Sequence, residues 1–246
     1  MHVLIVHAHP EPTSFNAALT DVATEMLRQA GHAVEVSDLY RSGFDPVEGP
    51  DHYAPRADPH RFAALAEQRQ AGQAGTLPSA VTAEIARLER ADLVIFQFPV
   101  WWHAPPAMLK GWLDRVFVSG RLYTSTKRYD RGHFRGKRAL VSVTAGAPAG
   151  TFGRGGRGGD LGAILWPLHY SLHYMGFTVL PPALAGGIQG HGYTYQGAEA
   201  LAGHLEERKR VWAERLHRLD GDVPLRFPGW DDWDAAGRSV AAAATC

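Results

Sequence analysis

The sequence contains a single cysteine, Cys246, which is the last of its 246 residues. One cysteine excludes an intrachain disulfide, a CxxC redox pair and a cysteine-based metal centre, and a reducing compartment fits this composition. A net charge is lacking too, because Lys plus Arg and Asp plus Glu both number 25. The chain therefore has no strong field to attract nucleic acid or an anionic membrane.

Long apolar runs and common ligand motifs are also missing. The segment Met1–Val6 is too short and wrongly flanked for a signal peptide, and no run is long enough to cross a bilayer. We therefore expect a cytoplasmic protein. The loop after the first expected strand has no GxGxxG, and the chain has no GxxxxGK[ST], so a Rossmann dinucleotide site at that loop and a P-loop are not supported. Without an HExxH pattern we expect no metal centre.

Short apolar runs alternate with segments of helical spacing along the chain. We expect strands at 3–6, 34–39, 93–98, 139–143 and 178–180. We expect helices from Ser14 to Gly31 and at 81–88, 108–118, 164–175 and 197–219. Ser14 is a suitable N-cap and Gly31 a suitable stop for the first helix. The alternation predicts an α/β fold, a flavodoxin-like doubly wound sheet of five parallel strands with helices on both faces.

The expected domain covers residues 1–219. Residues 41–78 are rich in glycine and proline, and we interpret them as a long surface excursion with at most a short helix near 62–70. The tail at 220–246 is rich in Trp, Pro and Asp. We expect it to pack on the domain or on a dimer partner.

In an open parallel sheet, ligands bind beyond the carboxyl ends of the strands. Three loops, at 7–14, 99–106 and 144–159, should meet there. The first leads into a helix N-terminus, whose free N–H groups and dipole favour a phosphate, with Ser14, Asn16 and His9 as additional donors. An ordinary helix cap without a ligand explains the same residues equally well.

The second loop carries Trp101 and Trp102 between prolines, which suits a flat aromatic ligand. Because neighbours at a strand end point to opposite sides, one of the two rings can equally belong to the core. The third loop opens with the small residues Thr144–Gly150, which let the backbone approach a ring closely. For Gly153–Gly159 we favour a plain flexible turn.

Several segments resemble the NAD(P)H:quinone oxidoreductases of the DT-diaphorase type. They are HAHPEPTSFN (7–16), SDLY (37–40), ADLVIFQFPVWW (91–102), PAMLKGWLDRVF (106–117), GDLGAILWPL (159–168) and LHYMGF (172–177). The resemblance implies non-covalent FAD in a homodimer whose sites lie at the subunit interface. It also implies ping-pong hydride transfer from NADH or NADPH to a quinone-like small molecule. FMN in place of FAD is the main alternative for the cofactor.

The resemblance also places site residues. The expected cofactor-binding residues are His9, Ser14, Phe15, Asn16, Pro99, Val100, Trp101, Trp102, His103, Thr144, Ala145, Gly146, Ala147 and Phe152. The expected substrate pocket comprises Trp102, Tyr123, Tyr129 and Tyr174. Asp114 is expected beside Phe15 and Asn16 on the adenine side. Core packing is the alternative for the pocket aromatics.

The chain departs from the family at two positions. Phe152 and Gly158 stand where well-known members carry a Tyr and a His proposed to stabilise charge on the reduced flavin. Neither residue has a side-chain donor, so no catalytic residue is assigned. Backbone amides could stabilise the charge. Arg154 or Arg157 could do so or bind a 2′-phosphate, or both could be solvated.

Three other functions are compatible with the sequence. They are a flavin-binding regulatory subunit of a membrane transporter, a non-enzymatic electron carrier, and a reductase of azo or nitroaromatic acceptors. The favoured function is two-electron reduction of quinones or similar acceptors by NAD(P)H.

Overall fold

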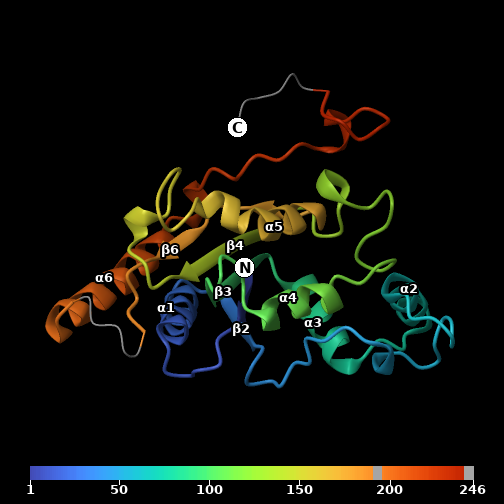
Figure 1. Ribbon diagram of the computed structural model, residues 1–246, viewed down its shortest axis with the longest axis horizontal. Coiled ribbons are helices and arrows are strands. Elements are labelled where there is room, and N and C mark those ends of the chain that lie inside the picture. Colours follow the sequence, from blue (N-terminus) through green and yellow to red (C-terminus); the bar gives the residue numbers. More distant parts are fainter. Residues whose placement is uncertain (191–195, 241–246) are drawn as a thin grey trace.

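The protein was analysed as a computed structural model, which describes residues 1–190 and 196–240, so that Cys246 lies outside the described residues. The sheet strands are β1 (His2–His7), β2 (Ala33–Asp38), β3 (Leu93–Pro99), β4 (Arg138–Thr144) and β5 (Thr178–Val179). They are parallel and run in the order β2-β1-β3-β4-β5 (Figure 1). This is the flavodoxin-like order, so the predicted fold class is confirmed.

A sixth strand was not predicted. Strand β6 (Ala183–Ala185) lies beside β4 in parallel, with Ser142 opposite Ala183. It has three residues and follows Pro181 and Pro182 directly. A run this short has no measurable hydrophobic period, so sequence pattern alone could not identify it.

Helices cover both faces of the sheet. The described helices are α1 (Phe15–Gln29), α2 (Ala64–Ala74), α3 (Ser79–Arg90), α4 (Ala107–Val116), α5 (Leu161–Tyr174) and α6 (Ala198–His217). Short 3-10 turns are η1 (Pro50–His52), η2 (Tyr129–Arg131), η3 (Ala149–Thr151), η4 (Leu219–Gly221) and η5 (Trp230–Asp232). Helices α1 and α6 pack on one face, and α3, α4 and α5 pack on the other.

The continuous apolarity of the strands follows from this two-sided cover. Successive β1 side chains point to opposite faces. Val3 and Ile5 join the core under α1 and α6, whereas Leu4 and Val6 join the core under α3, α4 and α5. All four are at most 2% exposed. Each such side chain contributes roughly 1.5–3 kcal/mol of hydrophobic stabilisation, so both faces hold the sheet.

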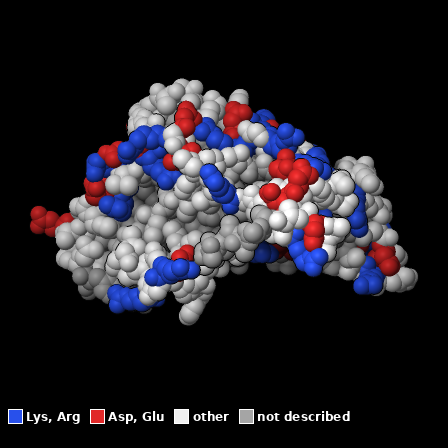
Figure 2. All heavy atoms as spheres, turned by 90° about the horizontal axis from the view of Figure 1, so that it is seen from above, with Lys and Arg blue, Asp and Glu red and all other residues white. Residues whose placement is uncertain are grey.

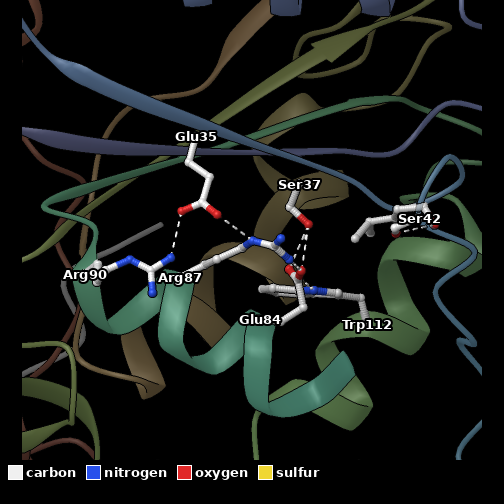
Figure 3. A network of polar contacts seen from close by, with 8 residues as sticks. Glu35, Ser37, Ser42, Glu84, Arg87, Arg90 and Trp112 are labelled. Carbon is white, nitrogen blue, oxygen red and sulfur yellow. Dashed lines mark hydrogen bonds and ion pairs between the residues drawn. The ribbon is translucent and has the colours of Figure 1, made fainter. Parts of the chain in front are cut away.

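A buried polar cluster joins the edge strand β2 to α3 and α4. We call it the Glu84 cluster, and it comprises Ser37, Glu84, Arg87 and Trp112 (Figure 3). The Glu84 carboxylate accepts from Ser37 Oγ at 2.8 and 2.9 Å and from Trp112 Nε1 at 2.9 Å, and it also pairs with Arg87. Both carboxylate oxygens are therefore satisfied inside the fold.

The excursion at 41–78 is fixed to the domain by buried polar contacts. Gln68, 2% exposed, donates to the Asp114 carbonyl at 3.0 Å and accepts from the Ser119 amide at 3.0 Å. At Gly111 an added Cβ would lie 2.1 Å from the Pro46 carbonyl oxygen, so the excursion touches α4 backbone to backbone. The helix in it, α2, runs to Ala74, a turn beyond the predicted 62–70.

The described part of the tail crosses α5 and lies above it in Figure 1. Its Leu225 amide donates to the Val179 carbonyl at 2.9 Å, and its Trp230 amide donates to Asp130 at 2.7 Å. Figure 2, which views the molecule from the tail side, shows positive and negative side chains interspersed on this face. Among the described helices, none has both the length and the apolar character needed to cross a membrane.

Candidate functional site

Three buried polar side chains tie together the first, second and third predicted loops. Asn16 Nδ2 donates to Thr144 Oγ1 at 2.8 Å, and Gln97 Nε2 donates to Asn16 Oδ1 at 2.8 Å. We call these three residues the Asn16 cluster, and each is at most 4% exposed. The Oε1 atom of Gln97 is buried and has no partner among the described residues. A buried oxygen without a donor indicates capacity left for a ligand or a water.

The N-terminus of α1 begins beside this cluster. Ser14 Oγ accepts from the Ala17 amide at 3.2 Å, so the predicted N-cap is present. The amides of Phe15 and Asn16 donate to no acceptor in the described part of the chain. Two free N–H groups and the helix dipole favour an anion here, and the Ser14 hydroxyl, which accepts from Ala17, keeps its own proton to donate.

His9 lies between the helix tip and the second loop. Its ring stands edge-on to Trp101, with ring centroids 5.8 Å apart. Its Nδ1 lies 3.0 Å from the Glu11 amide nitrogen and 3.2 Å from the Glu11 carbonyl oxygen, so Nε2 is the nitrogen left for a ligand. Burial lowers the pKa of His9 below its usual value of 6.5, and the ring is therefore mainly neutral at pH 7.

The second loop makes a tight turn from Trp101 to Ala104. These two residues exchange backbone hydrogen bonds of 3.0 Å, and the central residues Trp102 and His103 have φ of 50° and 58°. Two positive φ values define a type I′ turn, which normally uses Asn and Gly. Trp102 is also 97% exposed. Holding bulky residues in the left-handed region costs roughly 1–3 kcal/mol each, a form of strain that clusters at functional sites.

The unpredicted strand β6 fixes the third loop. The Ala145 amide donates to the Ala185 carbonyl, the Gly187 amide to Ala147 and the Ile188 amide to Ala145, at 2.8–3.0 Å. Gly186 is required here, because a Cβ would lie 2.4 Å from the Ala149 nitrogen. The segment after Leu180 therefore positions Thr144–Ala147, and sequence reasoning missed it because its only signal was a short glycine-flanked run.

The Gly153–Gly159 segment is more ordered than the flexible turn we favoured. The Gly158 amide donates to the Thr151 carbonyl at 3.0 Å, and a Cβ at Gly158 would lie 2.8 Å from Thr151 Oγ1. Arg154 and Arg157 are exposed, and neither guanidinium has a bonding partner within the described ranges. Their suggested roles stay predictions.

The expected pocket aromatics form two separate groups. Tyr123 and Tyr129 contact Tyr174, with ring centroids 5.5 and 5.0 Å apart, at the C-terminal end of α5. Trp102 lies with the second loop, near the N-terminal end of α5, where His103 approaches Gly159. The 14 residues of α5 span about 20 Å, so one chain does not bring Trp102 to the three tyrosines.

Asp114 is also separated from the residues it was expected to join. It lies on α4, which packs on the opposite face of the sheet from α1. Its carboxylate pairs with Lys110 at 2.6 Å. Asp114 therefore does not lie beside Phe15 and Asn16 within a single chain.

Comparison with known proteins identifies the family. The family described as having a flavodoxin-like fold matches residues 1–214. NAD(P)H dehydrogenase (quinone) 1 of Cavia porcellus is 41% identical over 226 residues, which cover 91% of this chain and 79% of that protein. The chain belongs to the NAD(P)H dehydrogenase (quinone) family.

Two further proteins match this chain over nearly its whole length and nearly the whole of their own. Ribosyldihydronicotinamide dehydrogenase (quinone) of Mus musculus is 39% identical, with 93% of this chain and 96% of the relative covered. A Klebsiella pneumoniae protein provisionally named a quinone reductase has a TM-score of 0.87 and 35% identity, covering 98% and 94% of the two chains. The resemblance in the quoted segments is thereby confirmed.

The three loops fit a flavin, the cofactor type of this family. The helix tip offers N–H groups for phosphates, and the amides of Trp102 and His103 have no acceptor in the described residues. The buried Gln97 oxygen completes a set of unused polar groups around the Asn16 cluster. Among the described side chains, no group of three or more His, Cys, Asp or Glu is placed to hold a metal ion.

Proposed function

We propose that the chain is a flavin-dependent oxidoreductase that transfers two electrons from NAD(P)H to quinones or similar acceptors. The observation that carries the proposal is the Asn16 cluster, which joins three strand-end loops and leaves one buried oxygen without a donor in the part of the chain that the structure describes. The cluster lies at the carboxyl edge of the sheet, where this fold binds ligands. Family membership supplies the reaction class.

The chemistry that a bound flavin supplies is hydride exchange, in which NAD(P)H, a quinone and one proton give NAD(P)⁺ and a hydroquinone. The helix tip at Phe15 and Asn16 would bind the phosphates, and His9 Nε2 would add a donor. The free amides of Trp102 and His103 would donate to the polar edge of the ring. Because the side chains of Phe152 and Gly158 have no hydrogen-bond donor, backbone amides would have to stabilise negative charge at the ring, and the one proton of the reaction would come from solvent.

The cofactor is proposed to be FAD, with FMN as the alternative. Phe15 and Asn16 lie at the helix tip in the positions that the resemblance assigns to the adenosine side. Heating the purified protein and separating the released flavin by HPLC distinguishes the two. A preparation that takes up neither flavin would end the proposal.

A homodimer is proposed as the active form. In one chain, Tyr123, Tyr129 and Tyr174 lie at one end of α5 and the loops proposed to bind the flavin lie near the other end, about 20 Å away along the helix. A complete pocket therefore needs a second copy of the chain. Sedimentation of the flavin-loaded protein should give a dimer. Mixing two inactive variants, Trp102→Ala and Tyr174→Ala, should restore about a quarter of the sites if each site uses both chains. No recovery in a verified mixed dimer would place the whole site in one chain.

The activity test is direct. The flavin-loaded protein should oxidise NADH or NADPH only when a quinone such as 1,4-naphthoquinone is present, with one hydroquinone formed per nicotinamide oxidised. Parallel lines in double-reciprocal plots at several quinone concentrations would show the ping-pong order. An absence of quinone-dependent oxidation would contradict the proposed function.

A further inference from the structure

An aromatic cavity of about 630 Å³ lies between η2, α5 and the tail. Its lining includes Arg128, Tyr129, Tyr170, Trp230 and Trp233. This volume lies within the range of small-molecule sites. The tail supplies two of the four rings, so the cavity exists only because the tail crosses α5.

The rings are arranged for a flat ligand. Tyr129 lies 4.6 Å from Trp233 and 5.9 Å from Trp230 between ring centroids, with the planes inclined by 57° and 45°. Tilted aromatic walls at these distances accept another ring by edge or offset contact. Tyr129 also contacts Tyr174, so the tyrosine group described above adjoins the cavity.

The charged side chains that line the cavity differ in whether they have an ion-pair partner. The lining acids Asp231 and Asp234 are each bound by an arginine outside the cavity, Arg131 and Arg238, both at 2.8 Å. Each acid therefore already has a cationic partner. Arg128 is the cation of the lining, and within the described residues no carboxylate lies within ion-pair distance of it.

Arg128 is held in place by neutral groups. Its Nη1 donates to the Tyr174 hydroxyl at 3.2 Å, and its guanidinium carbon lies 5.3–5.6 Å from the ring centroids of Tyr129, Tyr174 and Trp230. Its Nε is buried and has no hydrogen-bond partner in the described structure. The cation is therefore oriented by aromatic rings, while donor capacity remains for an anion.

We propose that this cavity binds flat aromatic anions, and that Arg128 pairs with a carboxylate or sulfonate on the bound ring. The inference rests on the proposed function in one respect: it predicts that, among quinones, those carrying such an anionic group are the preferred acceptors. Arg128 then acts as a specificity-determining residue. The binding step needs no redox chemistry and is testable separately.

The binding test uses the flavin-loaded protein and two non-reducible probes, naphthalene-2-sulfonate and neutral 2-naphthalenemethanol. Titration calorimetry should show that Arg128→Gln weakens sulfonate binding about tenfold and alcohol binding less than twofold, as expected for one charge-assisted contact. Arg128→Lys should recover part of the loss because it keeps the charge. Arg135→Gln removes an exposed cation outside the cavity and serves as the matched control.

The turnover test compares 1,4-naphthoquinone-2-sulfonate with 1,4-naphthoquinone under NADPH. The ratio of their kcat/KM values should fall about tenfold in Arg128→Gln relative to the wild type and to Arg135→Gln. Equal effects on both acceptors or both probes, or none on either, would overturn the inference. If neither quinone is reduced by the wild type, the proposed function fails, while the calorimetric result still decides whether the cavity binds anions.

Discussion

The Glu84 cluster and the Asn16 cluster are both buried and polar, but they differ in what is left unpaired. Every oxygen of Glu84 has a donor within the fold (Figure 3). In the Asn16 cluster the Gln97 oxygen has no donor among residues 1–190 and 196–240, and amides of α1 without an acceptor in the same ranges lie beside it. Leftover hydrogen-bonding capacity, rather than burial or polarity, therefore distinguishes the proposed ligand-binding region from the stabilising one.

The largest expected effect is at the closed cluster. Glu84→Ala leaves Trp112 Nε1 and the Ser37 hydroxyl without an acceptor, and Arg87 loses a buried partner. We expect a loss of about 3–4 kcal/mol in unfolding free energy, measured by urea denaturation. Flavin affinity of the folded fraction should not change. Glu25→Ala, at an exposed position of α1, is the control; equal stabilities for the two variants would show that the closed cluster does not stabilise the fold.

His169 tests the comparison, because it is buried without a partner but lies in the α5 core. It is 3% exposed, its Nε2 has no partner in the described structure, and burial lowers its pKa to about 4. In the unfolded chain the pKa is about 6.5. As the pH falls below 6.5, only the unfolded state takes up the proton, so stability falls until the pH nears 4.

His169→Gln should remove this dependence. The wild type should lose about 2.5 kcal/mol more than the variant between pH 7.5 and pH 4.5, measured by urea unfolding at each pH. His60→Gln, at an exposed position, should behave as the wild type. Identical pH profiles for the wild type and His169→Gln would mean that the ring finds a partner or is hydrated.

A smaller change in stability is expected at the open cluster. Gln97→Leu removes the hydrogen bond to Asn16 and exchanges one buried oxygen without a donor among the described residues, Gln97 Oε1, for another, Asn16 Oδ1. We therefore expect a loss of about 1 kcal/mol in unfolding free energy. Flavin affinity should fall at least about tenfold in a fluorescence titration. Gln73→Leu is the exposed control. A large loss of stability with unchanged flavin affinity would place Gln97 with the structural residues.

The smallest effect concerns the strained turn. Trp102→Gly and Trp102→Ala both remove an exposed ring, but only glycine relieves the positive φ. The glycine variant should be more stable than the alanine variant by about 0.5–1 kcal/mol in thermal or urea unfolding. Both should impair quinone reduction similarly. Equal stabilities would indicate that the turn relaxes without a penalty.

The sequence allowed prediction of the elements with a clear hydrophobic periodicity. It did not allow prediction of elements that depend on contacts between residues far apart in the chain. Strands β1, β3 and β4 and the Ser14 cap were identifiable because apolar alternation and capping chemistry are local. Strand β6 was not, since three residues carry no period and its pairing with β4 is long-range. The predicted strand 34–39 became Ala33–Asp38 because pairing with β1 sets its ends.

The candidate site was predicted at the level of loops rather than of geometry. Because parallel strands end at one edge, His9, Trp101 and Thr144 could be expected to converge. The hydrogen bonds from Gln97 to Asn16 and from Asn16 to Thr144 join residues 81 and 128 positions apart, and no local pattern encodes them. Trp102 and Tyr123 lie near opposite ends of α5, and this separation likewise depends on tertiary packing.

The charged edge of the sheet has a consequence for how copies of the chain can meet. Strand β2 is an outer strand, and its Glu35 is bound by Arg87 and Arg90 at 2.8 and 2.9 Å (Figure 3). Such fixed charges discourage strand-to-strand addition of another molecule and so protect against fibrous aggregation. Extension of the sheet by a second molecule at β2 is thereby disfavoured.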